Sequence, residues 1–126
     1  MHMNKKTILI VDDNADTRLI LSARLKANHY HTVFAADALQ AMSVAQKERP
    51  DAILLDLGLP GGNGLMVLQR LKANTALSAI PVIIVTAEDP QVAEARTSEA
   101  GAVAFLQKPV DQDKLMAAVR QVVGTT

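Results

Sequence analysis

The 126-residue sequence contains no cysteine and no tryptophan, and it has only three aromatic residues. Without cysteine, the chain can form neither a disulfide bond nor a thiolate metal site. The aromatic residues, Tyr30, Phe34 and Phe105, are too few to form a platform on which nucleic-acid bases could stack. The sequence therefore excludes disulfide bonds and thiolate metal sites, and it lacks the aromatic residues for binding nucleic-acid bases by stacking.

The sequence also lacks an excess of either charge. Thirteen lysine and arginine residues balance thirteen aspartate and glutamate residues, so the formal net charge is +0, and no block of basic residues occurs. Domains that bind nucleic acid usually gather lysine and arginine on one face. We therefore expect no direct nucleic-acid partner.

Long hydrophobic runs are missing as well. Only four apolar residues separate Thr7 from Asp12, which is too short for the core of a signal peptide. No other segment reaches the length that a membrane-spanning helix requires. We therefore expect a cytoplasmic protein with no membrane partner.

The length of the chain fits one domain with a core of its own. The opening Met1-His2-Met3 has the pattern of a cloning remnant with the natural start at Met3, so His2 carries no functional argument. We expect residues 4–126 to form the single domain.

Five short apolar runs are predicted as strands. They are rich in β-branched and aliphatic residues, and most lack the polar alternation of a strand with one face in water. The pattern indicates parallel strands that are covered on both faces. The runs are Thr7–Val11, His31–Ala35, Ala52–Leu55, Val82–Val85 and Val103–Leu106.

Segments with apolar residues at helical spacing lie between and after these runs. The first has Asn14 as its predicted cap, and the fourth is poor in large apolar residues. Alternating strands and helices predict an α/β fold, a doubly wound five-stranded parallel sheet with helices on both faces. The predicted helices are Ala15–Ala27, Ala38–Glu48, a segment beginning after Gly64, Gln91–Ala100 and Gln112–Val123.

Polar residues follow four of the predicted strands. In a doubly wound sheet, ligands bind outside the carboxyl ends of the strands, so these residues are expected to converge at one edge. Carboxylate oxygens suit Mg²⁺, while a lysine supplies a point charge and a threonine a hydroxyl donor for an anion. Together they favour phosphoryl transfer onto an aspartate. The residues are Asp12 and Asp13, Asp56, Thr86 and Lys108.

Four motifs, in this order along the chain, give it a resemblance to the receiver domain of response regulators in two-component signalling. They are IVDDN at Ile10–Asn14, LLDLGLPGGNG at Leu54–Gly64, VIIVTAE at Val82–Glu88 and GAVAFLQKP at Gly101–Pro109. The resemblance extends from Thr7 to about Val123. It implies a flavodoxin-like sheet with the strand order 2-1-3-4-5.

The resemblance also implies a role for each site residue. Asp56 would be the phosphoacceptor. Mg²⁺ or Mn²⁺ would be held by Asp12, Asp13, Asp56 and the backbone carbonyl of Gly58. Lys108 would pair with the phosphoryl group.

A second set of implied roles concerns the switch. Thr86 would reorient toward the phosphoryl group, and Phe105 would be the aromatic residue that rotates with it. The Lys108–Pro109 bond is expected to be cis.

Gly58 and Glu88 depart from the usual family pattern at the rim of the site, so the lifetime of the phosphoryl group stays open. At position 29 histidine replaces the usual helix-ending glycine, and Asn28 is expected to take the left-handed conformation instead.

By this resemblance the protein is a signalling switch and not an enzyme. A sensor histidine kinase or a phosphotransfer protein would supply the phosphoryl group to Asp56. The surface of the fourth helix, fifth strand and fifth helix would then change and bind a downstream output protein or domain.

Two other functions fit part of the sequence. One is a phosphorylation-independent interaction module on the same fold, although no site residue is missing. The other is a phosphatase of the haloacid-dehalogenase type, which uses a D-x-D pair where this chain has adjacent Asp12 and Asp13, and which generally needs a longer chain. A flavin-binding relative would need a phosphate-binding loop and aromatic residues that this chain lacks.

Overall fold

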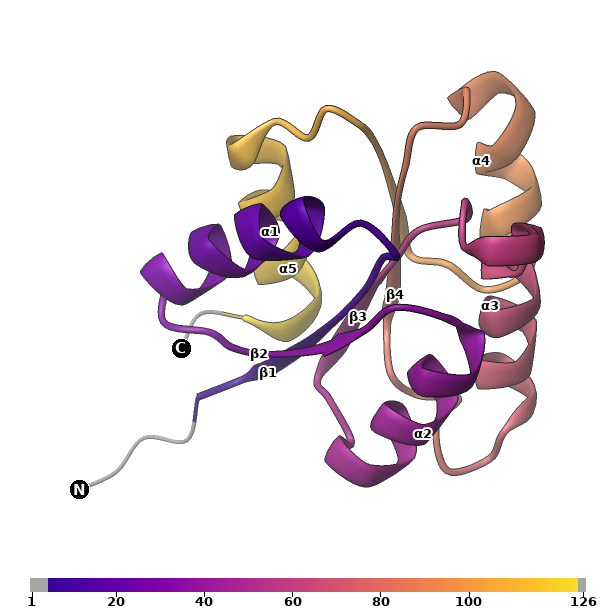
Figure 1. The fold of residues 1–126 in the computed structure, drawn as a ribbon, viewed down its shortest axis with the longest axis horizontal. Helices are drawn as coiled ribbons and strands as arrows, with labels where there is room; N and C mark the ends of the chain where they lie inside the picture. Colours follow the sequence, from indigo (N-terminus) through magenta and orange to yellow (C-terminus); the bar gives the residue numbers. More distant parts are fainter. Residues whose placement is uncertain (1–4, 125–126) are drawn as a thin grey trace.

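The computed structural model describes residues 5–124, and its centre is a five-stranded sheet with the order β2-β1-β3-β4-β5 (Figure 1). Every neighbouring pair is parallel. The predicted doubly wound α/β fold is therefore confirmed, whereas the expected cloning remnant at residues 1–3 lies outside the described residues. The strands are β1 (Thr7–Val11), β2 (His31–Ala35), β3 (Ala52–Leu55), β4 (Val82–Thr86) and β5 (Ala104–Gln107).

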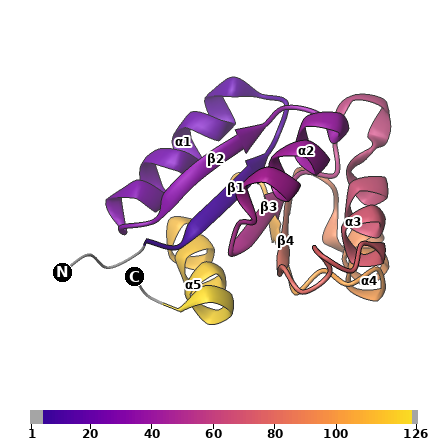
Figure 2. The ribbon, with the colours of Figure 1, turned by 90° about the horizontal axis from the view of Figure 1, so that it is seen from below.

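Helices cover both faces of the sheet. In Figures 1 and 2, α1 and α5 lie on one face, and α2, α3 and α4 lie on the other. No helix among residues 5–124 is long and apolar enough to cross a membrane. The helices are α1 (Ala15–Ala27), α2 (Ala38–Glu48), the short 3-10 helix η1 (Pro60–Gly62), α3 (Gly64–Ala73), α4 (Pro90–Glu99) and α5 (Gln112–Val123).

The hydrophobic core forms two clusters, one on each face. Side chains of a strand alternate between faces, so Ile8 and Ile10 of β1 join the cluster under α1 and α5, whereas Leu9 and Val11 join the cluster under α2 and α3. The central strands β1, β3 and β4 are almost wholly buried, while the edge strands β2 and β5 are partly exposed. The central strands are thus fixed by burial on both faces.

Several element ends differ from the predictions by one residue. Strand β4 continues to Thr86, and β5 runs one residue later than expected, from Ala104 to Gln107. The later end follows from main-chain pairing, because Thr86 and Gln107 are partners in the ladder and Lys108 then donates to the Thr86 carbonyl. Helix α4 runs from Pro90 to Glu99, one residue earlier at each end than predicted.

The end of α1 shows one prediction to be wrong. His29 has φ 72° and takes the left-handed conformation, whereas Asn28 has φ −106°. The side-chain amide of Asn28 donates to the carbonyl of Arg24, and its oxygen accepts from Arg120. These bonds hold Asn28 against the end of the helix, so the next residue makes the turn. At the other end, Asn14 caps the helix as predicted by accepting from the Thr17 N–H.

Candidate functional site

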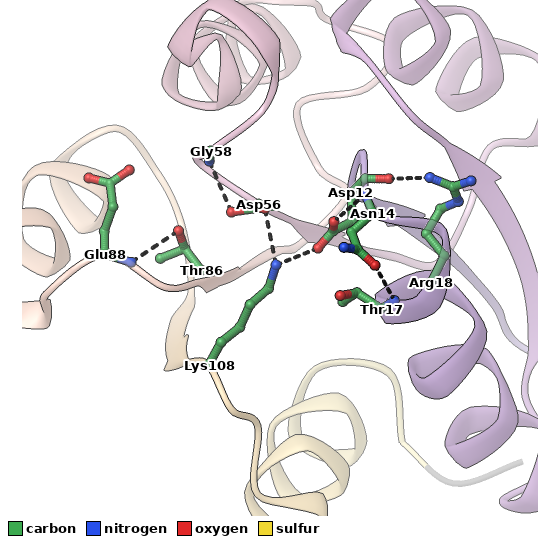
Figure 3. A network of polar contacts seen from close by, with 9 residues as sticks. All are labelled: Asp12, Asn14, Thr17, Arg18, Asp56, Gly58, Thr86, Glu88 and Lys108. Atoms are coloured by element: carbon green, nitrogen blue, oxygen red, sulfur yellow. Dashed lines mark hydrogen bonds and ion pairs between the residues drawn. The ribbon is translucent and has the colours of Figure 1, made fainter.

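Four of the predicted site residues, Asp12, Asp56, Thr86 and Lys108, lie together at the carboxyl ends of the strands (Figure 3). Asp12 follows β1 and Asp56 follows β3, and these adjacent strands are joined in register at Val11 and Leu55. The Asp56 N–H donates to the Val11 carbonyl at 3.0 Å. The sheet reverses its winding between β1 and β3, which is where doubly wound folds bind ligands.

Three carboxylates form an acidic cluster at this edge. One oxygen each from Asp12, Asp13 and Asp56 lies within 4.8 Å of the others. Asp12 is 2% exposed and Asp56 is 7% exposed, whereas Asp13 faces solvent. Carboxylates so close together repel each other unless a cation lies between them or one is protonated.

Lys108 supplies one such cation. Its Nζ lies 2.6 Å from Asp12 Oδ2 and 3.1 Å from Asp56 Oδ2, so the ammonium bridges the two buried carboxylates. Burial alone lowers the pKa of Lys108, but hydrogen bonds to Asp12 and Asp56 and the charges of both carboxylates raise it above its ordinary value. The lysine therefore stays protonated at neutral pH. One ammonium leaves the three-carboxylate cluster negative.

The carboxylate oxygens of the cluster are suitable ligand atoms for a hard divalent cation. Asp12 Oδ1 accepts from the Asn14 N–H and Asp56 Oδ1 accepts from the Gly58 N–H, both at 2.9 Å. Each carboxylate oxygen has a second lone pair for a metal. Asp13 makes no hydrogen bond or ion pair with another residue of 5–124, so it can turn toward an ion. An all-oxygen set of this kind suits Mg²⁺, and the Gly58 carbonyl remains a predicted ligand.

Two glycines shape the loop that leaves Asp56. A Cβ on the exposed Gly58 would lie 3.5 Å from Asp56 Oδ1, an ordinary contact, so glycine leaves that side of the carboxylate uncovered. A Cβ on Gly64 would lie 2.4 Å from both the Asp56 carbonyl oxygen and Leu57 Cα. The first residue of α3 therefore packs directly on the backbone of the acceptor loop.

Thr86 and Phe105 lie where the sequence predicted them. Thr86 is 1% exposed, and its Oγ1 accepts a long 3.4 Å bond from the Glu88 N–H. The Glu88 carboxylate lies 3.5 Å from the Arg96 guanidinium of α4. Phe105 is half-buried against the cluster under α2 and α3. Their roles as moving parts stay predictions.

Sequence reasoning missed two arginines of α1. Arg18 Nη1 donates to the Asp12 carbonyl at 2.7 Å, and Arg24 Nη1 donates to the Val110 carbonyl at 3.0 Å. A helical arginine is usually solvated, so no sequence signal separated these two from the other arginines. Val110 follows the Lys108–Pro109 bond, which is cis.

Comparison with known proteins points to one family. The sequence model of the response regulator receiver domain matches residues 8–120. Sporulation initiation phosphotransferase F of Bacillus subtilis is 40% identical over 119 residues, which cover 94% of each chain. Response regulator PleD of Caulobacter vibrioides is 39% identical over 113 residues; the match covers 90% of this chain and 25% of PleD. The chain thus spans about a quarter of that relative's length.

A solved structure adds a metal to the comparison. The receiver domain of a sensor histidine kinase from Pseudomonas aeruginosa PAO1 superimposes with a TM-score of 0.86 at 29% identity, covering 97% of this chain and 100% of that one. That structure has a magnesium ion coordinated in its active-site cleft. The acidic cluster of Asp12, Asp13 and Asp56 is the group of residues here that could hold such an ion.

Proposed function

This chain belongs to the response regulator receiver domain family of two-component systems, and on that premise we propose that it is a signalling switch that accepts a phosphoryl group on Asp56. The observation that carries the proposal is the position of Asp56, which belongs to the acidic cluster and whose carboxylate contacts the Lys108 ammonium. The chain then acts as a substrate of its donor protein and is not itself an enzyme.

The reaction is the transfer of one phosphoryl group between proteins. An Asp56 oxygen forms a bond to phosphorus while the phosphorus–nitrogen bond of the donor's phosphohistidine breaks, and the imidazole nitrogen leaves with the bonding pair. Asp56 is held for this attack by the Gly58 N–H on one oxygen and by Lys108 on the other. The Lys108 ammonium also lies where it can neutralise phosphoryl oxygens.

Asp12, Asp13 and Asp56 would hold Mg²⁺ or Mn²⁺ for this reaction. When bound, the metal supplies positive charge that reduces the electrostatic repulsion between the incoming phosphoryl group and the three carboxylates. The protein residues contribute the oxygen ligands, and Asp12 is fixed for that role by its bonds to Asn14 and Arg18. Removal of the metal is therefore expected to stop phosphorylation.

The switch follows from the new charge. The acyl phosphate carries up to about two negative charges where the Asp56 carboxylate carried one, and it places them farther out, on the phosphoryl oxygens. The Thr86 hydroxyl, which has only a long 3.4 Å bond to the Glu88 N–H, can leave it and donate to the phosphoryl group. Helix α4 buries only Ala93 and Thr97, so its displacement exposes little apolar surface. We propose that the α4, β5 and α5 surface changes in this way and binds the output partner.

The direct test uses acetyl phosphate as the phosphoryl donor. The protein incubated with acetyl phosphate and Mg²⁺ is expected to gain one phosphate by intact mass spectrometry, and hydroxylamine is expected to remove it. A parallel sample with EDTA is expected to gain none. Absence of the adduct in Mg²⁺ would overturn the proposal and favour a phosphorylation-independent module, and sustained hydrolysis of p-nitrophenyl phosphate would instead indicate a phosphatase.

A groove beside Lys108 suits the docking of the donor protein. It has a volume of about 390 Å³ and lies between α1 and the segment Lys108–Val110. Lys108 lines the groove and also touches Asp56, so a protein that presents a phosphohistidine to Asp56 would cover it. Ile20 of α1 lies in the groove and is 52% exposed, which makes it an apolar contact for that partner.

An Ile20→Glu substitution should separate docking from chemistry. The variant is expected to accept a phosphoryl group from a protein donor about tenfold more slowly, which corresponds to the loss of about 1.4 kcal/mol expected for an apolar anchor at the centre of an interface. Its rate with acetyl phosphate should be unchanged. The protein donor is whichever member of a panel of autophosphorylated sensor histidine kinases transfers fastest to the parent chain.

The matched control for this substitution is Leu39→Glu. Leu39 is an exposed apolar residue of α2, 82% accessible and outside the groove, so its replacement should change neither rate. Equal loss in both variants would show that the charge itself slows transfer. If the Ile20→Glu variant were slowed as much with acetyl phosphate as with the protein donor, the substitution would disturb the phosphorylation site itself.

A further inference from the structure

Helix α1 is bonded to two of the three loops that carry the charged residues of the site. Arg18 bonds to the carbonyl of Asp12 in the loop after β1, and Arg24 bonds to the carbonyl of Val110 in the loop after β5. The second contact joins residues that are 86 positions apart in the sequence. One helix thus positions the acid pair and the segment that bears Lys108.

The main chain of the loop from Lys108 to Asp111 makes few other hydrogen bonds. The Lys108 N–H donates to the Thr86 carbonyl at 2.8 Å, and Pro109 has no N–H to donate. At the far end, Asp111 caps α5 through the N–H groups of Asp113 and Lys114. Within residues 5–124, Arg24 is the only side chain that donates to the main chain of residues 108–110.

A guanidinium bond to a carbonyl is a strong restraint. Hydrogen bonds from a charged donor are about twice as strong as neutral ones, and the planar guanidinium fixes their direction. Arg24 is half-buried, so solvent competes less for this bond than at an exposed site. Loss of the bond would leave Val110 held by its apolar packing alone, with no side-chain hydrogen bond to the main chain of residues 109 and 110.

We propose that Arg24 is a positioning residue for phosphoryl transfer, which holds the Lys108 ammonium against Asp56 by fixing the Val110 carbonyl. The proposal rests on the proposed function, in which Lys108 neutralises the incoming phosphoryl group. Arg24 touches neither the acceptor nor the acidic cluster. Its effect passes through the loop, and a misplacement of about 1 Å in such a group can lower a rate as much as 100-fold.

The test is a double-mutant cycle that follows acyl phosphate formation from acetyl phosphate at saturating Mg²⁺. Arg24→Met keeps the apolar stem and removes the donor, and Lys108→Met removes the ammonium. Arg24→Met is expected to lower the initial rate about tenfold in the parent chain and less than about twofold in the Lys108→Met chain, because residues that act through one another are not additive. Arg24→Lys should restore part of the rate.

One control variant and two contrary outcomes make the cycle decisive. Arg70→Met, at an exposed arginine of α3 whose side chain makes no hydrogen bond within residues 5–124, should leave the rate unchanged. An Arg24→Met effect of equal size with and without Lys108 would overturn the proposal, since a general loss of stability acts in both backgrounds. An unchanged rate in Arg24→Met would also overturn it.

A crystal structure of Arg24→Met tests the proposal without phosphorylation. The Lys108 Nζ is expected to leave hydrogen-bond distance of Asp56. If Nζ remains within 3.1 Å of Asp56 Oδ2, as it is in the parent chain, Arg24 does not position it. Failure of the parent chain to accept a phosphoryl group would count against the proposed function, and the crystal structure would still decide the role of Arg24.

Discussion

An Asp56→Asn variant will form no acyl phosphate when it is incubated with acetyl phosphate and Mg²⁺. The amide has no carboxylate oxygen to attack phosphorus, so the effect is a complete loss and not a slower rate. Asparagine keeps the size of aspartate, and its oxygen can still accept from the Gly58 N–H. The variant should therefore fold, and intact mass spectrometry of both proteins measures the difference directly.

Asp16→Asn is the matched control for this loss. Asp16 is an exposed carboxylate in the first turn of α1, near the site in sequence but outside the acidic cluster. It should gain the same hydroxylamine-sensitive phosphate as the parent chain. If Asp56→Asn gains an equal adduct, the phosphoryl group is carried by another residue and the assignment of Asp56 is wrong.

The sheet could be predicted from the sequence where strands are buried on both faces. The bounds of β1 and β3 match the apolar runs, because a strand that is buried on both faces is mostly apolar and a charged residue follows its end. Strand β5 lies at an edge and is partly exposed, so its composition gave a weaker signal. Its end is set by main-chain bonds to β4, which a single sequence does not display.

The convergence of the site was predictable for a topological reason. Parallel strands end at one edge, so Asp12, Asp56 and Lys108 had to approach one another once the strands were assigned. The details depend on side-chain packing. Neither the bridge of Lys108 to Asp12 at 2.6 Å nor the bond of Arg24 to Val110 follows from spacing along the chain.

The conformation of His29 shows the same limit on a smaller scale. Asparagine tolerates left-handed backbone better than histidine, so local preference favoured Asn28. In the fold, however, Asn28 forms hydrogen bonds to Arg24 and Arg120, and His29 is the residue that adopts the left-handed conformation. Contacts with α5, 92 residues away, overrode the local preference.

Replacing Gly64 by alanine will destabilise the protein, although alanine is the better helix former. Gly64 is the first residue of α3, and helix propensity alone would favour alanine by about 1 kcal/mol. The added Cβ would lie 2.4 Å from the Asp56 carbonyl oxygen and from Leu57 Cα. Both atoms belong to the backbone, so neither can rotate away, and the helix or the acceptor loop must shift.

The steric term is expected to exceed the propensity term. Overpacking costs 1–3 kcal/mol in typical cores, and a clash with two backbone atoms belongs at the upper end, so we expect a net loss of about 2 kcal/mol in the free energy of unfolding. Urea denaturation without metal measures it. A shift of the Asp56 backbone should also slow phosphorylation by acetyl phosphate in the fraction that stays folded.

Gly58→Ala provides the comparison that isolates the cause. It adds the same methyl group at the other glycine beside Asp56, in the acceptor loop, but the nearest atom would be Asp56 Oδ1 at an ordinary 3.5 Å, and the residue is exposed. Its stability should stay within about 0.5 kcal/mol of the parent chain. If Gly64→Ala proved as stable as Gly58→Ala, α3 would not be packed against the acceptor loop, and the rigid placement of Asp56 would need another source. A large difference in stability between the two variants would show that the loop bearing Asp56 is held by contact with α3. The exposed side of that loop, at Gly58, is left open to a phosphoryl donor.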